Sequence, residues 1–129
     1  MNLIAFPIDM VWPHIVKNIC ELRYRFEKYS DWTVQEVFYA CESKKAVIFK
    51  SDSDGSFAIV KLKDGNDGEK VLFIWIAFIE NGKREYYFDC MKKIARDLGA
   101  TKMSFQSPRV GWDKDPLWKR TLTTYETEV

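Results

Sequence analysis

Apolar residues along this chain follow two spacings, and each spacing predicts a type of element. Leu3–Phe6 is a short apolar run that Pro7 ends, which predicts a first strand. Pro13 is then expected to open a helix, because a proline at the first helical position gives up an N–H that has no partner there anyway. Apolar residues would share one face of this helix: Ile15, Ile19, Leu22 and Phe26.

A second helix is predicted after Trp32. Thr33 is followed three residues later by Glu36, and this pair forms a capping box in which each side chain bonds the backbone N–H of the other residue. Apolar residues again share one face: Val34, Val37, Phe38 and Cys41. The helical pattern fades at Glu42–Lys44.

Three strands are predicted next, and two polar segments separate them. The strands are Ala46–Phe49, Ser56–Leu62 and Val71–Phe78, and the segments between them, Ser51–Gly55 and Lys63–Lys70, are rich in Asp, Ser and Gly. The third strand is apolar at every position. Both of its faces should therefore be covered, which places it in the middle of the sheet.

A long helix is predicted over Lys83–Leu98, after the strand-breaking pair Asn81–Gly82. Its apolar stripe consists of Tyr87, Met91, Ile94, Ala95 and Leu98. Gly99 stands where a helix-ending glycine is expected. Thr101–Gln106 alternates polar and apolar residues and predicts another strand.

The C-terminal part of the chain is more polar. Pro108–Pro116 is predicted to be a loop, Leu117–Arg120 at most a short helix, and Leu122–Val129 a threonine-rich strand at an edge of the sheet. No repeat, low-complexity tract or linker interrupts the chain, so residues 1–129 are expected to form a single domain.

Composition narrows the range of functions. The chain has 129 residues, of which 47% are hydrophobic, and its formal net charge is +1. A polyanion-binding protein usually carries a clustered basic surface, so nucleic acid is not a predicted partner. The longest apolar run, Val71–Ile79, is too short to cross a membrane, so no membrane association is predicted.

Cysteine and histidine are scarce. Cys20, Cys41 and Cys90 are odd in number and widely spaced, and each lies beside apolar residues at a helical position, so buried free thiols are expected. Free thiols favour a reducing compartment, which predicts a cytoplasmic protein. With His14 as the only histidine, no metal site is predicted.

The order of the predicted elements is strand, two helices, three strands, a long helix, a strand, a short helix and a final strand. This order resembles that of the GNAT N-acetyltransferase superfamily over nearly the whole chain, and Val71–Gln106 carries the best match. The resemblance implies an α+β fold with a mixed, mostly antiparallel sheet and helices on both faces. It also implies a glycine-containing loop whose backbone N–H groups hold the pyrophosphate of coenzyme A at the start of the long helix.

In this sequence the loop corresponds to Ile79–Arg84. The resemblance implies that coenzyme A would contact the central strand and this loop at Ile76, Phe78, Asn81, Gly82, Lys83 and Arg84. The family pattern is a basic residue or Gln, two others, Gly, one other, then Gly or Ala, and only Gly82 matches it. Ile79 replaces the first polar residue, and Arg84 adds bulk where a small residue lets phosphate approach.

The loop contains charged residues that would oppose phosphate binding and others that would favour it. Glu80 places a negative charge beside the implied anion site, whereas Lys83 and Arg84 are themselves able to bind phosphate. The sequence therefore assigns no cofactor and leaves acetyl-CoA as a candidate ligand.

No catalytic residue is assigned. Family enzymes often use a tyrosine in the short helix near the C-terminus to protonate the leaving thiolate, but Trp118 takes that place, and an indole cannot act as that acid. The general base is usually a carboxylate on or near the central strand, yet Val71–Ile79 has none. Glu80 is the nearest candidate, and a solvated loop charge is the favoured interpretation of it.

One short stretch points to a narrower group. Ser107–Trp112 resembles the Arg-x-Gly-Trp stretch of small GNAT-like proteins encoded by bacteriophages, some of which resemble virion or morphogenesis components. Arg109, Trp112 and Trp118 are therefore predicted to line a surface for a protein partner or an acceptor. The alternative is a turn at Gly111, with Trp112 anchored in the core.

Two classes of function follow. The first is a GNAT-fold protein without catalysis that binds a protein partner, in the host cytoplasm or in a virion. The alternative is an acetyl-CoA-dependent N-acetyltransferase in which an amine attacks the thioester directly. An unrelated α+β domain is a third option.

Overall fold

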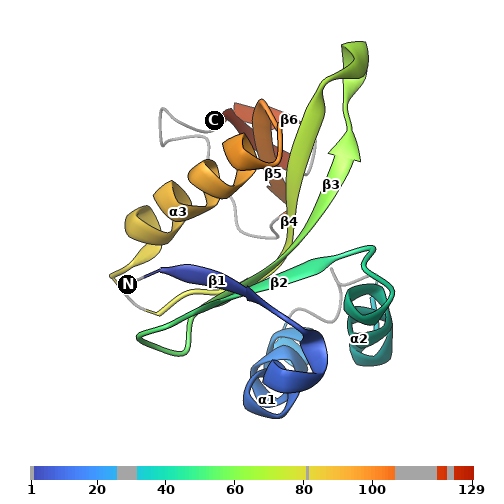
Figure 1. The fold of residues 1–129 in the computed structure, drawn as a ribbon, viewed down its shortest axis with the longest axis vertical. Helices are drawn as coiled ribbons and strands as arrows, with labels where there is room; N and C mark the ends of the chain where they lie inside the picture. Colours follow the sequence, from blue (N-terminus) through green and yellow to red (C-terminus); the bar gives the residue numbers. More distant parts are fainter. Residues whose placement is uncertain (1, 26–31, 81, 107–118, 122–123) are drawn as a thin grey trace.

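A single sheet organises the described part of the chain (Figure 1). The structure is a computed structural model that describes residues 2–25, 32–80, 82–106, 119–121 and 124–129. Its seven strands lie in the order β1-β2-β3-β4-β5-β7-β6, and all neighbours are antiparallel except β4 and β5, which are parallel. The strands are β1 (Leu3–Phe6), β2 (Val47–Ser51), β3 (Phe57–Asp64), β4 (Lys70–Phe78), β5 (Lys102–Gln106), β6 (Lys119–Thr121) and β7 (Thr124–Glu128).

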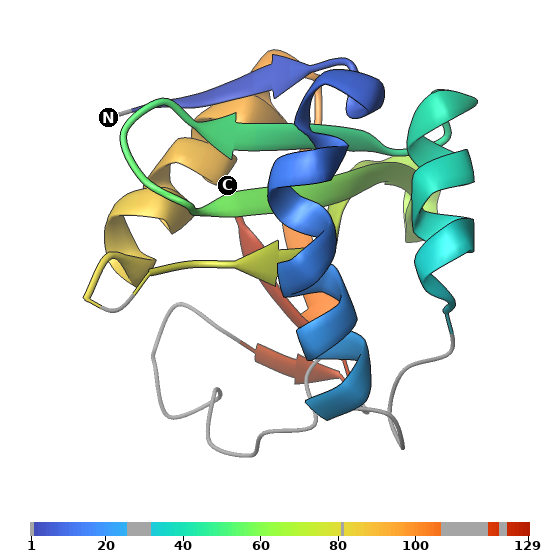
Figure 2. The same ribbon diagram turned by 90° about the horizontal axis from the view of Figure 1, so that it is seen from below.

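Helices lie on both faces of the sheet. The helices α1 (Ile8–Arg25) and α2 (Val34–Glu42) cover one face, and α3 (Arg84–Asp97) lies on the other (Figures 1 and 2). A short 3-10 turn, η2 (Asn66–Gly68), stands between β3 and β4. The predicted α+β class, with a mixed and mostly antiparallel sheet, is confirmed.

Each face of the sheet has its own apolar cluster, and β3 shows how one strand serves both. Ala58 and Val60 belong to the cluster under α3, whereas Phe57 and Ile59 belong to the cluster under α1 and α2. All four side chains are buried. Alternate residues of a strand point to opposite faces, so these two clusters follow directly from the pleat.

The strand β4 is the fourth of the seven, as its continuous apolar sequence predicted. It pairs with β3 as far as Phe78, but its parallel pairing with β5 stops at Ile74 and Phe105. Ile59 pairs with Ile76 and Val60 with Ile74, which leaves Trp75 as the extra residue of a β-bulge. The final part of β4 is therefore paired on its β3 side and lies beyond the recorded β5 pairing.

The helix α3 holds the predicted stripe against the sheet. Tyr87, Met91 and Ala95 are buried, and Gly99 adopts a φ of +82° just after the helix, as a helix-ending glycine should. Leu98, which was predicted to continue the stripe, is 46% exposed. It is the C-cap residue, so it lies where the helix leaves the sheet.

The start of α1 differs from the prediction. The helix begins at Ile8, and Pro13 lies inside it instead of opening it. Ile8 and Val11 are 6% and 5% exposed, so the extra first turn buries apolar surface against the sheet. Pro13 is still close to the helix start. It removes one backbone hydrogen bond, to the carbonyl of Asp9, and the burial of Ile8 and Val11 outweighs this loss.

The C-terminal strands also differ from the prediction. Lys119–Thr121 forms β6, so the short helix predicted over Leu117–Arg120 is wrong for the residues of that range that the structure describes. The last strand, β7, pairs with β5 on one side and β6 on the other, so it is not an edge strand. The pairing with β6 decides this placement, because it covers the side of β7 that faces away from β5, and the polar sequence did not indicate it.

The prediction of buried thiols is wrong for Cys20, which is exposed. It follows Ile19, whose side chain is fully buried, and the next position on a helix turns about 100° away from that face. Cys41 and Cys90 are half-buried. Burial raises the pKa of the Cys41 thiol to about 11, although the charge of Lys61 partly offsets this effect.

Met91→Ala tests the packing of α3 on the sheet. The side chain is 1% exposed, so its loss should lower the free energy of unfolding by about 2–4 kcal/mol through lost burial and a cavity. Urea denaturation gives this value, with the exposed Lys93→Ala as a control that changes it by less than about 0.5 kcal/mol. Equal effects of the two substitutions would remove Met91 from the core.

Candidate functional site

The predicted cofactor residues lie where β4 ends and α3 begins. Ile76 is buried, and the ring of Phe78 stacks on that of Phe57 with 5.9 Å between the ring centroids. Gly82 adopts a φ of +81°, which favours glycine, and Asn81 lies outside the described residues. Because these residues follow one another along the chain, the fold keeps them at one end of the sheet.

Lys83 and Arg84 mark the start of α3. Lys83 is the N-cap residue and Arg84 is the first helical residue, which is exposed. The Lys83 side chain makes no cap hydrogen bond to the helix. An ammonium group has no acceptor atom, so it cannot bond the first-turn N–H groups as Ser, Thr or Asp would.

Lys83 forms an ion pair with Asp54, which lies in the turn between β2 and β3. The distance from Lys83 Nζ to Asp54 Oδ2 is 2.9 Å. The Asp54 side chain is only 8% exposed and that of Lys83 is 35% exposed. The contact joins residues that are 29 positions apart, and it brings the β2–β3 turn against the loop implied to hold coenzyme A.

Asp54 has further hydrogen-bond partners. The hydroxyl of Tyr87 donates to Asp54 Oδ2 at 3.0 Å, and the backbone N–H of Ser56 donates to Asp54 Oδ1 at 2.7 Å. Ser51 Oγ lies 2.7 Å from the Tyr87 hydroxyl oxygen. Since that hydroxyl gives its proton to Asp54, Ser51 is the donor in this last bond. We call Ser51, Asp54, Lys83 and Tyr87 the Asp54 network.

The network changes the ionisation of both charged groups. Burial acts to raise the pKa of Asp54, but hydrogen bonds from Lys83, Ser56 and Tyr87 outweigh burial and hold this pKa well below its ordinary value. The hydrogen bond to Asp54 raises the pKa of Lys83. Both groups are therefore charged at neutral pH.

Glu80 ties the end of β4 to the same turn. Its backbone N–H donates to Ser56 Oγ at 3.0 Å, and its Oε1 accepts from the backbone N–H of Gly55 at 3.3 Å. Glu80, which the sequence offered as a candidate base, thus serves as an acceptor for the backbone of the β2–β3 turn.

Comparison with solved structures finds the same architecture. A chain described as a probable acetyltransferase superposes with a TM-score of 0.59 at 14% identity, over 84% of this chain and 80% of that one. An acetyltransferase of the GNAT family from Listeria monocytogenes 4b F2365 has a TM-score of 0.54 at 8% identity, over 98% and 95%. A chain of the NatC complex bound to Gag peptide and CoA also has a TM-score of 0.54, at 11% identity, over 99% and 96%.

The fold is that of the GNAT acetyltransferases. Comparison of the sequence itself finds no matching family model and no matching curated protein. At these identities the likeness shows the GNAT fold and does not carry over the activity of any neighbour.

The residues at the start of α3 do not fit the diphosphate that coenzyme A would bring to this place in a GNAT fold. The ammonium of Lys83 already has an anionic partner, and that partner, Asp54, is a charged carboxylate held against the loop. Glu80 adds a second carboxylate, and Arg84, which is cationic, is a bulky residue at the first helical position. A diphosphate placed here would meet the like charges of Asp54 and Glu80, which oppose its binding.

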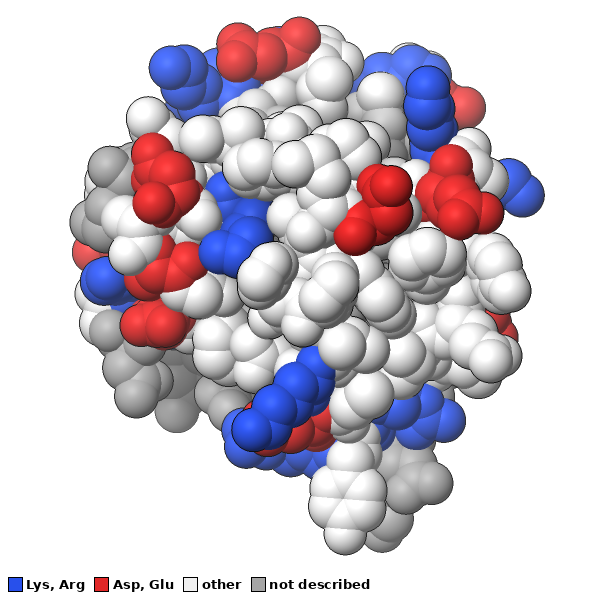
Figure 3. Space-filling view, turned by 60° about the horizontal axis from the view of Figure 1, so that its bottom comes forward, with Lys and Arg blue, Asp and Glu red and all other residues white. Residues whose placement is uncertain are grey.

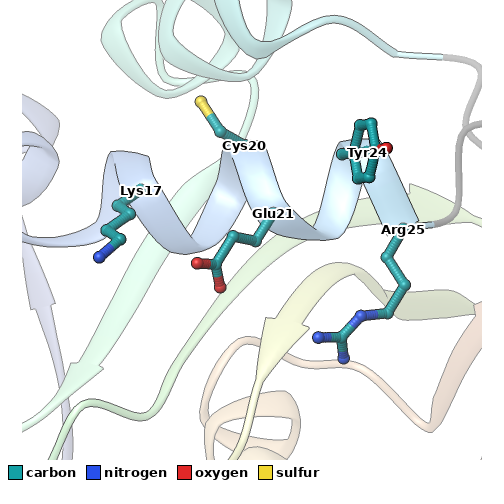
Figure 4. Close-up of a pocket in the computed structure, with 5 residues that line it drawn as sticks. All are labelled: Lys17, Cys20, Glu21, Tyr24 and Arg25. Atoms are coloured by element: carbon teal, nitrogen blue, oxygen red, sulfur yellow. The ribbon is translucent and has the colours of Figure 1, made fainter.

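Two surface hollows lie away from this site. One is formed by α1 alone, with Lys17, Cys20, Glu21, Tyr24 and Arg25; Figure 4 shows the three charged side chains on one side of the helix and Cys20 on the other. The other lies on and just beyond α2, with Glu36, Tyr39, Ala40, Glu42, Ser43 and Lys45. Neither hollow includes a residue of β4 or α3.

The described surface offers little to other ligand classes. On the face in Figure 3, basic and acidic side chains are interspersed around a broad uncharged centre. Within the described residues, no three His, Cys, Asp or Glu side chains gather as a metal site requires. No described helix is long and apolar enough to cross a bilayer. Arg109, Trp112 and Trp118 lie outside the described residues.

Sequence reasoning missed the Asp54 network. Ser51–Gly55 was interpreted only as a turn, and Tyr87 only as part of the apolar stripe of α3. One signal was available, because a tyrosine on a buried face needs a partner for its hydroxyl. That the partner would be Asp54 depends on the packing of α3 over the β2–β3 turn, which no local pattern reveals.

The ionised Asp54 should make stability depend on pH. Its pKa is lower in the folded state, so its contribution is present above the ordinary carboxyl pKa of about 3.9 and is lost as the pH falls below that value towards the folded pKa. Asp54→Asn should therefore flatten the fall in stability between about pH 5 and pH 2. Urea denaturation across this range measures the slope, and the exposed Asp52→Asn in the same turn is the control. Parallel curves for wild type and Asp54→Asn would contradict the prediction.

Proposed function

We propose that this GNAT-fold chain acts by binding a protein partner and not by transferring an acetyl group. It would do so as one domain in a cytoplasm or, as a bacteriophage protein, in a virion. The similarity of Ser107–Trp112 to a stretch of small phage GNAT-like proteins supports the phage assignment.

The observation that carries the proposal is the lack of an acid or base where the reaction would take place. From Val71 to Phe78, β4 offers only apolar side chains. Glu80 follows the strand, and its carboxylate accepts the Gly55 N–H within the β2–β3 turn. General acid–base catalysis needs a group that is within reach of the reacting atoms and able to exchange a proton with them. The described end of β4 supplies none.

A catalytic alternative rests on one specific feature. The pairing of β4 with β5 stops at Ile74, and the strand runs on to Phe78. In the family that this chain resembles, the corresponding backbone bonds the pantetheine arm of coenzyme A. One neighbour is a complex bound to CoA, which makes acetyl-CoA a plausible ligand of the fold. In this alternative, Ile76 and Phe78 would hold the arm, and Gly82, Lys83 and Arg84 would meet the phosphates.

Acetyl-CoA binding separates the two functions. The unmodified protein should bind acetyl-CoA with a dissociation constant well above micromolar, because carboxylates flank the phosphate position and Lys83 is already paired. Isothermal titration calorimetry measures this constant, and an assay of free thiol release with a panel of amines tests for turnover. A micromolar or tighter constant, about −8 kcal/mol, together with turnover would establish the acetyltransferase instead.

The partner is expected to contact the segment that carries Arg109, Trp112 and Trp118. Tryptophan and arginine are the residue types that most often anchor protein interfaces. Arg109→Ala should weaken partner binding by more than about 1 kcal/mol and leave the melting temperature unchanged. Affinity capture from the source cell, followed by titration of the captured protein, provides the measurement.

Trp112→Ala distinguishes an interface from a core role. If Trp112 is a core residue, its loss should cost about 3–5 kcal/mol of stability. An Arg109→Ala variant that binds normally, combined with a Trp112→Ala variant that unfolds, would show that the segment is structural.

A further inference from the structure

We infer that Asp54 takes the place of a ligand phosphate as the anionic partner of Lys83, so that the start of α3 is closed to nucleotide diphosphates by the chain's own β2–β3 turn. This inference deepens the proposed function and rests on it, since it names the residue that excludes the cofactor of the fold.

The first support for this inference comes from the hydrogen bonds that Asp54 accepts. Asp54 Oδ2 accepts from two groups of α3 at once, Lys83 Nζ at 2.9 Å and the Tyr87 hydroxyl at 3.0 Å. Lys83 is the N-cap residue, and Tyr87 lies one turn further along the helix. A carboxylate of the chain therefore meets the ends of two side chains that α3 presents at its start, the end at which a helix favours an anion.

The turn that carries Asp54 is fixed from several directions. The Ser56 N–H holds Asp54 Oδ1, and Lys50 Nζ donates to the Asp54 carbonyl oxygen at 3.2 Å. The N–H groups of Ser53 and Asp54 both donate to Ser51 Oγ, at 3.1 and 3.3 Å. Glu80 adds its two bonds to Ser56 and Gly55. These contacts fix the backbone of the turn, and rotation of the Asp54 side chain away from Lys83 would also break its bonds with the Ser56 N–H and the Tyr87 hydroxyl.

The negative charges of Asp54 and Glu80 determine how a phosphate-bearing ligand would bind at the start of α3. An arriving diphosphate would have to displace Asp54 from Lys83, share the three N–H donors of that lysine with Asp54, or bind beside two carboxylates without the use of the lysine. Displacement would also leave Asp54, which is 8% exposed, without its cationic partner, and an unpaired buried charge is costly. Asp54 thus acts as a selectivity residue that rejects phosphate-bearing ligands.

A double-mutant cycle with acetyl-CoA and with inorganic pyrophosphate as separate probes tests this inference. Asp54→Asn removes the charge and keeps one oxygen, which can still accept from the Ser56 N–H, while the amide nitrogen takes the place of Oδ2 beside Lys83 and Tyr87. It should tighten binding of both probes at least about tenfold, as removal of a like charge next to a phosphate predicts. Adding Lys83→Gln to that variant should return the affinity to the wild-type level, because the released lysine is the gained contact.

Asp52→Asn is the matched control, since it neutralises an exposed carboxylate of the same turn. It should change either affinity by less than about twofold, because screened surface charges act weakly. Circular dichroism checks folding at the working temperature, and Asp54→Ser replaces any Asp54→Asn sample that does not fold.

The outcomes are distinct. Tightening by Asp54→Asn that Lys83→Gln reverses supports the inference. Unchanged affinity in a folded Asp54 variant, or equal tightening by Asp52→Asn, overturns it and leaves the proposed function standing if wild type still binds weakly. Micromolar binding of acetyl-CoA by wild type overturns both. Tighter pyrophosphate binding without tighter acetyl-CoA binding also counts against Asp54 as the residue that excludes the cofactor.

Discussion

Burial of β4 on both faces is the constraint on which the rest of this structure depends. Its buried side chains divide between the two sides of the sheet: Leu72 and Ile74 belong to the cluster under α3, and Ile76 belongs to the cluster under α1 and α2. A polar side chain at these positions would lose hydration without compensation. The end of the strand that leads into α3 carries the Asp54 network.

At that end, stability and binding compete for the same groups. A lysine at the start of a helix is a ready partner for a phosphate, but in this chain it is part of a buried network that joins two segments far apart in the sequence. Each member of the network satisfies another: Lys83 neutralises Asp54, Tyr87 donates to it, and Ser51 donates to Tyr87. A satisfied polar network of this kind stabilises one arrangement and resists exchange with a ligand.

Three backbone features mark the end of β4 and the start of α3. The β-bulge at Trp75 turns the end of β4, the β5 pairing stops at Ile74, and Gly82 adopts the positive φ that the turn into α3 requires. The overall arrangement of helices and strands survives large changes in sequence, as the 8–14% identities to solved acetyltransferase-type chains illustrate. The side chains around these features do not suit a diphosphate. The fold therefore suggests a cofactor site at this place, whereas the side chains argue against one.

The sequence by itself determined the elements whose signals are local. Thr33 caps α2 as predicted, with the Glu36 N–H bonded to Thr33 Oγ1, which is one of the two bonds of a capping box, and the continuous apolar run predicted the central position of β4. The apolar stripe of α3 and the role of Gly99 at its end were also predicted from the sequence, because periodicity and backbone preference act over a few residues. Only the tertiary structure decided the extra first turn of α1 through Pro13 and the pairing of Asp54 with Lys83. Each of these depends on which distant surface an element meets, and that information arises only when the chain packs.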